Sequence, residues 1–179
     1  MSFPIVQTGP STAQIGCFML VLGIDPGSTV TGYGVVTSSR GRYHFVDAGV
    51  IKTNSKTPMG ERLLAIHDGL VEVLQRHQPE QVAIEQIFSH RSSESALRLG
   101  QARGVALLAS ARCGHEATPY NPMVIKQTVG AHGKADKDAV ARMVRVLLGV
   151  DLDLPADATD ALAIAITHCA HSRMRKVAS

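Results

Sequence analysis

Two short apolar segments of this chain each end in an acidic residue, and this pattern restricts the possible folds more than any other feature. The first spans residues 20–25 and ends at Asp25, directly before a Pro-Gly turn, and the second spans residues 81–85 and ends at Glu85. Short apolar runs that stop in this way are typical of buried strands. In α/β folds the carboxyl ends of the sheet strands border the ligand site. The pattern therefore predicts an α/β domain with two carboxylates beside its ligand site.

The rest of the chain is expected to alternate between strands and helices, because β-branched stretches and apolar residues at helical spacing follow one another. The expected strands are residues 20–25, 33–38, 43–53, 81–85 and 117–120, and the expected helices are residues 58–77, 92–111, 136–148, 157–171 and one that begins at Pro122. This order indicates a single layered α/β domain. We expect the domain to span residues 19–172, after a poorly ordered extension (1–18, with Met19 a candidate start) and before a basic tail (173–179).

The composition excludes several classes of protein. With 45% hydrophobic and 18% charged residues, the chain can bury a core and is not expected to be disordered. It contains no apolar run near the roughly 18 residues that a membrane span needs. Its three cysteines form no C-x-x-C pair, which favours reduced thiols in a cytoplasmic protein over disulfides or a zinc site.

The middle of the chain is more basic than the whole, whose net charge is only +3. Between Gln86 and Arg145 there are nine lysines and arginines against four aspartates and glutamates. This excess predicts an anionic partner such as nucleic acid. The alternative is a set of solvated helix faces, which the charge count alone cannot distinguish from a binding surface.

The acids at the strand ends suggest a metal site. A carboxylate at the end of a buried strand costs several kcal/mol to desolvate unless a cation or hydrogen-bond donors compensate. If the two strands are neighbours, Asp25 and Glu85 repel each other and the pKa of one rises, unless a divalent ion lies between them. Asp157 and Asp160 share one face at the start of a predicted helix and would add two ligands. Helix capping by Asp157 is the alternative explanation of that second pair.

The type of ligand indicates the type of metal and of chemistry. Four carboxylates without a histidine- or cysteine-rich cluster suit Mg²⁺ or Mn²⁺ rather than zinc. Two such ions catalyse phosphodiester hydrolysis, in which one generates hydroxide from water and the other stabilises the leaving oxygen. The histidines that have no partner at a suitable spacing are expected at the surface or at helix ends, namely His67, His77, His115, His168 and His171.

Five segments in register resemble the RuvC family, the bacterial Holliday-junction resolvases of the RNase H-like superfamily. They are LGIDPGSTVTGYGVV, VAIEQIF, LRLGQARGVALLA, IKQTVGAHGKADKDAV and PADATDALAIAITH. The resemblance implies an RNase H-like fold, with a central mixed sheet of five strands flanked by helices. It also implies a homodimer with two Mg²⁺ ions in each active site, for which Mn²⁺ would substitute.

The resemblance also assigns roles to individual residues. The carboxylates implied as catalytic metal ligands are those of Asp25, Glu85, Asp157 and Asp160. The implied DNA-binding residues are Phe88, Lys126 and Lys137. Phe88 would stack on a base near the crossover, and the alternative is a core phenylalanine. The two lysines would hold backbone phosphates, and the small residues around Gly100 and Gly104 would lie at the dimer interface.

The implied function is the resolution of Holliday junctions by paired, symmetric nicks near the crossover during recombination and repair. The implied partners are four-way junction DNA, a second copy of the chain, a branch-migration motor and a junction-binding tetramer of the same pathway. Three alternatives remain: a related nuclease that acts on RNA, a junction-binding module without catalysis, and an ATPase with an actin-like phosphate loop. The ATPase alternative is disfavoured because such proteins need two domains of this kind, and this chain is too short for both.

Overall fold

The computed structural model describes residues 18–86, 92–130, 137–151 and 153–177, and within these ranges it contains one sheet and five helices. The strands are β1 (Met19–Asp25), β2 (Val30–Ser39), β3 (Arg42–Lys52), β4 (Gln81–Glu85) and β5 (Ala117–Tyr120). The helices are α1 (Met59–His77), α2 (Ser93–Arg112), α3 (Pro122–Gly130), α4 (Lys137–Leu148) and α5 (Ala156–Val177). Every expected element is present, with its ends shifted by a few residues.

The sheet is mixed, as the sequence predicted. Its strand order is β3-β2-β1-β4-β5, in which β1, β2 and β3 are antiparallel and β1, β4 and β5 are parallel. The antiparallel strands β2 and β3 join through a tight turn, where Arg40 and Gly41 have φ values of 50° and 82°. The parallel strands need longer crossovers, and α1 and α2 provide them. The two acid-bearing strands, β1 and β4, are therefore direct neighbours at the centre of the sheet.

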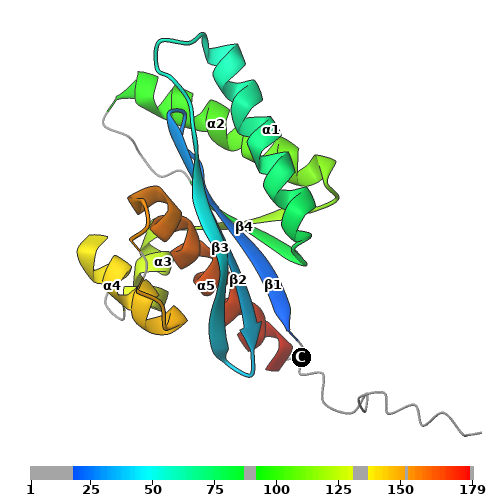
Figure 1. The fold of residues 1–179 in the computed structure, drawn as a ribbon, viewed down its shortest axis with the longest axis vertical. Helices are drawn as coiled ribbons and strands as arrows, with labels where there is room; N and C mark the ends of the chain where they lie inside the picture. Colours follow the sequence, from blue (N-terminus) through cyan, green and yellow to red (C-terminus); the bar gives the residue numbers. More distant parts are fainter. Residues whose placement is uncertain (1–17, 87–91, 131–136, 152, 178–179) are drawn as a thin grey trace, which may run out of the picture.

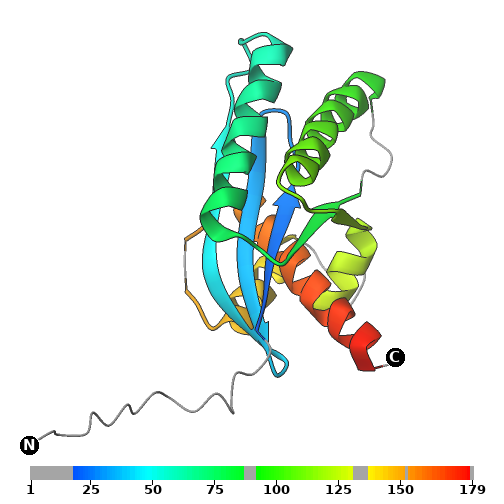
Figure 2. The same ribbon diagram turned by 90° about the vertical axis from the view of Figure 1, so that its right-hand side faces the viewer.

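Helices cover both faces of the sheet, because alternate residues of each strand point to opposite sides. Helices α1 and α2 cover one face, and α3, α4 and α5 cover the other (Figures 1 and 2). Leu22 and Ile24 of β1 belong to the core on the first face, whereas Val21 belongs to the core on the second. The central strands are consequently buried on both sides. This burial explains their nearly continuous apolar sequence.

Helix α5 lies unusually close to the sheet because glycines of β1 and β2 face it. A Cβ atom on Gly23 would lie 2.1 Å from the carbonyl oxygen of Ala161, and one on Gly32 would lie 2.0 Å from that of Asp157. Any larger residue at either position would push the helix away. The glycines therefore determine how near the first turns of α5 come to the end of β1.

Some expectations about the ends of the chain differ from the structure or lie outside it. Helix α5 continues to Val177, beyond the expected end at residue 171, and residues 172–177 contain no glycine or proline that would stop it. The expected extension over residues 1–18 lies outside the described residues except for Phe18. Among the described helices, none combines the length and the apolar character that a membrane crossing requires.

Candidate active site

The carboxylates of Asp25 and Glu85 lie side by side on the face of the sheet that α5 covers. Side chains alternate along a strand, so Asp25 points to the same face as Gly23, on which α5 packs. Glu85 likewise shares the face of Ala83, which packs in the core formed with α5. The parallel register of β1 and β4 pairs Ile24 with Ile84, so the two strands end at the same level. The predicted convergence of the two strand ends is confirmed.

Helix α5 brings the second pair of acids to the same place. Asp160 lines a cavity together with Asp25 and Glu85, and Asp157 acts electrostatically on Asp25. The alternative explanation, in which Asp157 stabilises the start of the helix, coexists with this placement, because α5 begins at Ala156 and Asp157 is the acid of its first turn. All four predicted carboxylates are therefore grouped around the end of β1.

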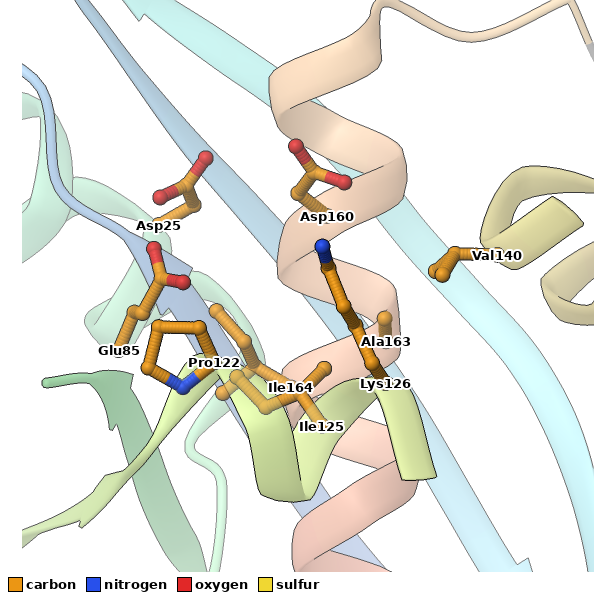
Figure 3. A pocket seen from close by; sticks show the side chains of 9 residues that line it. All are labelled: Asp25, Glu85, Pro122, Ile125, Lys126, Val140, Asp160, Ala163 and Ile164. Atoms are coloured by element: carbon orange, nitrogen blue, oxygen red, sulfur yellow. The ribbon is translucent and has the colours of Figure 1, made fainter. Parts of the chain in front are cut away.

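The cavity has a volume of about 230 Å³ and an acidic wall above an apolar floor (Figure 3). Asp25 and Glu85 form one side of it, and Asp160 faces them from α5. The other residues that line it are Pro122, Ile125, Lys126, Val140, Ala163 and Ile164. The ammonium group of Lys126 points into the space between the carboxylates of the strands and that of the helix.

Burial, followed by the charges of Glu85 and Asp160, raises the pKa of Asp25 from 3.8 to about 8. A hydrogen bond to Glu85 and the charge of Asp157 act in the same direction. Asp25 therefore retains its proton near neutral pH and donates a hydrogen bond to the carboxylate of Glu85. The sequence predicted this effect for two acids at neighbouring strand ends.

The donor set fits a hard divalent cation. All four acidic side chains offer carboxylate oxygens, and no imidazole or thiolate is among the residues that line the cavity. Within the described ranges, no three acidic, imidazole or thiolate groups form a ready-made ligand cluster. Instead, Asp25 and Glu85 share a proton, which relieves the repulsion between them. A divalent cation would replace that proton and, together with the ammonium group of Lys126, offset the negative charge of the acids.

The three predicted DNA-binding residues have different outcomes. Lys126 lies on α3, which begins where the sequence predicted: Pro122 is its first residue, and Asn121 Oδ1 accepts a hydrogen bond of 2.8 Å from the Met123 N–H. This start directs Lys126 into the cavity. Lys137 is the first residue of α4, but its side chain lies outside what the structure describes, as does the whole of Phe88.

Two arginines near the acids were not singled out from the sequence. Arg103 of α2 donates a hydrogen bond of 3.2 Å from Nε to the backbone carbonyl of Glu85. Arg62 of α1 is buried against the turn that follows Asp25. One sequence feature could have pointed to Arg62: it lies four residues before Ile66, on the apolar stripe of a predicted helix. A charged residue at such a position needs partners from elsewhere in the fold.

The expectation that His168 lies at the surface or at a helix end is wrong, whereas His77 does end α1 but has a partner. His168 is only 5% exposed and meets the Tyr120 ring edge-on, with 5.6 Å between ring centroids. His77 Nε2 lies 2.8 Å from Asp47 Oδ2 of β3. These partners are 48 and 30 residues away in the chain, so no local spacing could indicate them.

Comparison with known proteins relates the whole domain to one family. The model of the family described as crossover junction endodeoxyribonuclease RuvC matches residues 21–168. A protein of that name from Pelotomaculum thermopropionicum is 43% identical over 154 residues, which cover 86% of this chain and 94% of the relative.

Solved structures agree with this result. Thermus thermophilus RuvC in complex with a Holliday junction substrate superposes with a TM-score of 0.83 at 42% identity, covering 88% of this chain and 96% of that one. The yeast mitochondrial Holliday junction resolvase superposes with a TM-score of 0.63 at 12% identity, covering 92% and 83% of the two chains. The second match concerns the fold alone. The RNase H-like architecture expected from the sequence is confirmed.

Proposed function

Because this chain belongs to the RuvC family of crossover junction endodeoxyribonucleases, we infer that it resolves Holliday junctions by nicking two opposed strands near the crossover. The observation that carries the mechanism is the meeting of Asp25, Glu85 and Asp160, from three separate segments, around one cavity beside Lys126. Carboxylates in that number suit phosphodiester hydrolysis assisted by divalent cations. The family membership and the acidic cavity argue against the two alternatives of a junction-binding module without catalysis and of an ATPase.

We propose that Asp25, Glu85, Asp157 and Asp160 hold two divalent cations, for which Mg²⁺ is the natural choice and Mn²⁺ a substitute. When bound, such cations supply the charge that activates an attacking water and stabilises the leaving 3′ oxygen. Asp25 must give up its proton to serve as a ligand, and its raised pKa sets the pH at which it does so without a cation. Without a cation, that proton forms the hydrogen bond between Asp25 and Glu85, and it leaves the pair when a cation binds both carboxylates.

Lys126 is proposed to hold the scissile phosphate against the acidic wall. Its ammonium group points into the space between the strand carboxylates and that of Asp160 (Figure 3), where it can pair with a non-bridging phosphate oxygen. Phe88 and Lys137 are proposed, from the resemblance alone, to contact DNA near the crossover. The branch-migration motor and the junction-binding tetramer are expected partners on the same ground.

The Lys126→Gln variant is expected to bind a four-way junction less tightly, by about 5- to 10-fold, and to cut it more slowly. The slope of log Kd against log salt should fall by about one, because one phosphate contact is lost. Electrophoretic mobility shift at several salt concentrations measures both quantities. Lys56→Gln, which alters an exposed lysine away from the cavity, is the matched control. An unchanged salt slope in Lys126→Gln would contradict the phosphate contact.

A homodimer is proposed through the outer face of α2. Leu97 and Leu108 are 64% and 60% exposed there. Between them, a Cβ atom on Gly100 or Gly104 would meet nothing within 4 Å. The opposite face of α2 packs its alanines in the core with α1. An exposed leucine and glycine stripe allows two helices to approach closely. A symmetric pair of sites also matches the two-fold symmetry of a four-way junction.

The Gly104→Arg variant is expected to be monomeric at concentrations at which the unaltered chain is dimeric, because the long charged side chain occupies the proposed contact. Light scattering after size-exclusion chromatography measures the mass. The control is Gly60→Arg, a substitution at an exposed helical glycine of α1 that also has free space. A monomeric unaltered chain, or a dimeric Gly104→Arg variant, would argue against this interface.

The nuclease assignment is tested with a synthetic mobile four-way junction, labelled at one strand end in turn, with and without Mg²⁺. Paired cuts at symmetric positions on opposed strands, seen on a denaturing gel, are the expected result. Linear duplex and an RNA–DNA hybrid serve as comparison substrates. Preferential cutting of the hybrid would instead favour the related nuclease that acts on RNA.

A further inference from the structure

Arg62 of α1 is buried beside the turn that links Asp25 to β2. Of the arginine, lysine, aspartate and glutamate residues that the structure describes, it has the smallest exposed fraction, 5%. We propose that Arg62 is a positioning residue for strand cleavage, which holds the β1–β2 turn so that Asp25 and the acids of α5 keep the separation that a divalent cation requires. This inference rests on the function proposed above.

The guanidinium group of Arg62 and the hydroxyl of Thr53 converge on the same two residues of the turn. Arg62 Nη2 donates to the carbonyl of Ser28 and to Thr29 Oγ1, the latter at 3.2 Å, and Nε donates to Thr53 Oγ1 at 3.2 Å. Thr53 donates from its backbone N–H to the Thr29 carbonyl and from Oγ1 to the Ser28 carbonyl, each at 2.8 Å. The turn is thereby fastened to both α1 and the residue that follows β3.

The turn is connected through backbone contacts to Asp25 and to the start of α5, which carries the second pair of acids. It is closed internally by Thr31, whose Oγ1 donates to the Gly27 carbonyl at 2.8 Å. Immediately beyond it, Gly32 pairs with Asp25 in the sheet register. Gly32 also packs against the backbone of Asp157, where even a Cβ atom would not fit. A displaced turn therefore moves Asp25 and loosens the contact that holds the start of α5.

The chemistry of the contacts explains why the residue is an arginine. A buried guanidinium is expensive to desolvate, and the partners described here are neutral oxygens rather than a carboxylate. The planar guanidinium group donates to the turn and to Thr53 at the same time. Neither a lysine nor a glutamine side chain can make both sets of hydrogen bonds. Geometry rather than charge is thus the property that the site uses.

The test compares Arg62→Gln and Arg62→Lys with Arg76→Gln. Arg76 lies on the same helix, and its half-exposed side chain pairs with Glu72 at the surface. For Arg62→Gln we expect the single-turnover cleavage rate to fall about 10- to 100-fold and the half-saturating Mg²⁺ concentration to rise about 10-fold. Junction affinity in chelator should stay within about 2-fold, since the phosphate contacts remain. The cleavage rate and Mg²⁺ requirement of Arg62→Lys should lie between those of Arg62→Gln and the unaltered chain. Those of Arg76→Gln should match the unaltered chain.

Two further measurements do not depend on cleavage. Mn²⁺ binding by calorimetry should weaken in Arg62→Gln, and hydrogen exchange should accelerate over residues 26–32 while α5 and the rest of α1 keep their protection. Thr53→Val, which removes the shared hydroxyl and leaves α1 intact, should show the same changes to a smaller degree. It replaces Arg62→Gln if that variant does not fold.

The outcomes separate this inference from the proposed function. An unaltered Mn²⁺ affinity and local exchange in the variants would overturn the role of Arg62, as would a loss of protection spread evenly over the domain. If the unaltered chain binds Mn²⁺ but cuts no junction, the proposed function fails. The Mn²⁺ and exchange data then still decide whether Arg62 positions the acids.

Discussion

The Asp25→Asn variant is expected to lose junction cleavage by about 10³-fold or more, measured as the single-turnover rate on an end-labelled four-way junction in saturating Mg²⁺. Asp25 is the carboxylate that the other three surround, and their charges act on it. Asparagine keeps the shape of the side chain and removes its charge. A cation shared by the strand and helix acids would therefore lose its central ligand.

Binding of the junction should survive this substitution, because phosphate contacts by basic side chains supply most of the affinity. Glu85→Gln and Asp160→Asn should lose cleavage in the same way, since they line the same cavity. Asp153→Asn, at an exposed acid outside the cavity lining, is the matched control and should cut normally. Cleavage by Asp25→Asn at the rate of the unaltered chain would show that the reaction takes place elsewhere.

The second large effect concerns stability against pH in the presence of a chelator. The folded state raises the pKa of Asp25 from 3.8 to about 8. Between these values the folded protein retains a proton that the unfolded chain releases. The stabilisation is therefore complete below about pH 4 and is lost as the pH rises through 8, with a slope of up to about 1.4 kcal/mol per pH unit. Thermal unfolding in chelator should accordingly show a Tm that falls over this range.

Mg²⁺ should reverse this trend, because it binds the deprotonated carboxylates and thus stabilises the folded state more at pH 8 than at pH 5. Asp25→Asn provides the control, since it removes both the titration and the repulsion. Its Tm in chelator at pH 8 should exceed that of the unaltered chain by about 2–8 °C, equivalent to roughly 1–2 kcal/mol for a domain of this size. Identical pH profiles of the two proteins would contradict the assignment of the titration to Asp25.

The two strand-end acids could be predicted because the rule that brings them together is local and general. An apolar run that ends at an acid indicates a buried strand and the residue at its end. Parallel neighbours then place such ends at one edge of the sheet. The predicted pKa rise followed from that adjacency; at Asp25, burial is the larger cause of the rise, and the charge of Glu85 adds to it. By contrast, the role of the pair Asp157 and Asp160 stayed open, since a spacing of three suits both a helix start and a ligand pair.

The packing of α5 brings this pair close to the acids of the strands. Gly23 and Gly32 let the backbone of α5 lie directly on β1 and β2, and this contact carries Asp160 to the cavity. In the sequence, these glycines have no feature that distinguishes them from other glycines in strands. Their importance depends on which helix crosses them, and that is a property of the tertiary structure.

The residue pattern by itself determined the order of the elements and the acids that end two apolar strands, because hydrophobic period and strand-end chemistry act over a few neighbouring residues. The mixed sheet was implied by the family resemblance. Only the tertiary structure decided the partners of the buried polar groups. Arg62 meets a turn 34 residues away, and His168 meets Gln81 across 87 residues. A buried charge or imidazole is stable only with hydrogen-bond partners, and long-range packing chooses those partners.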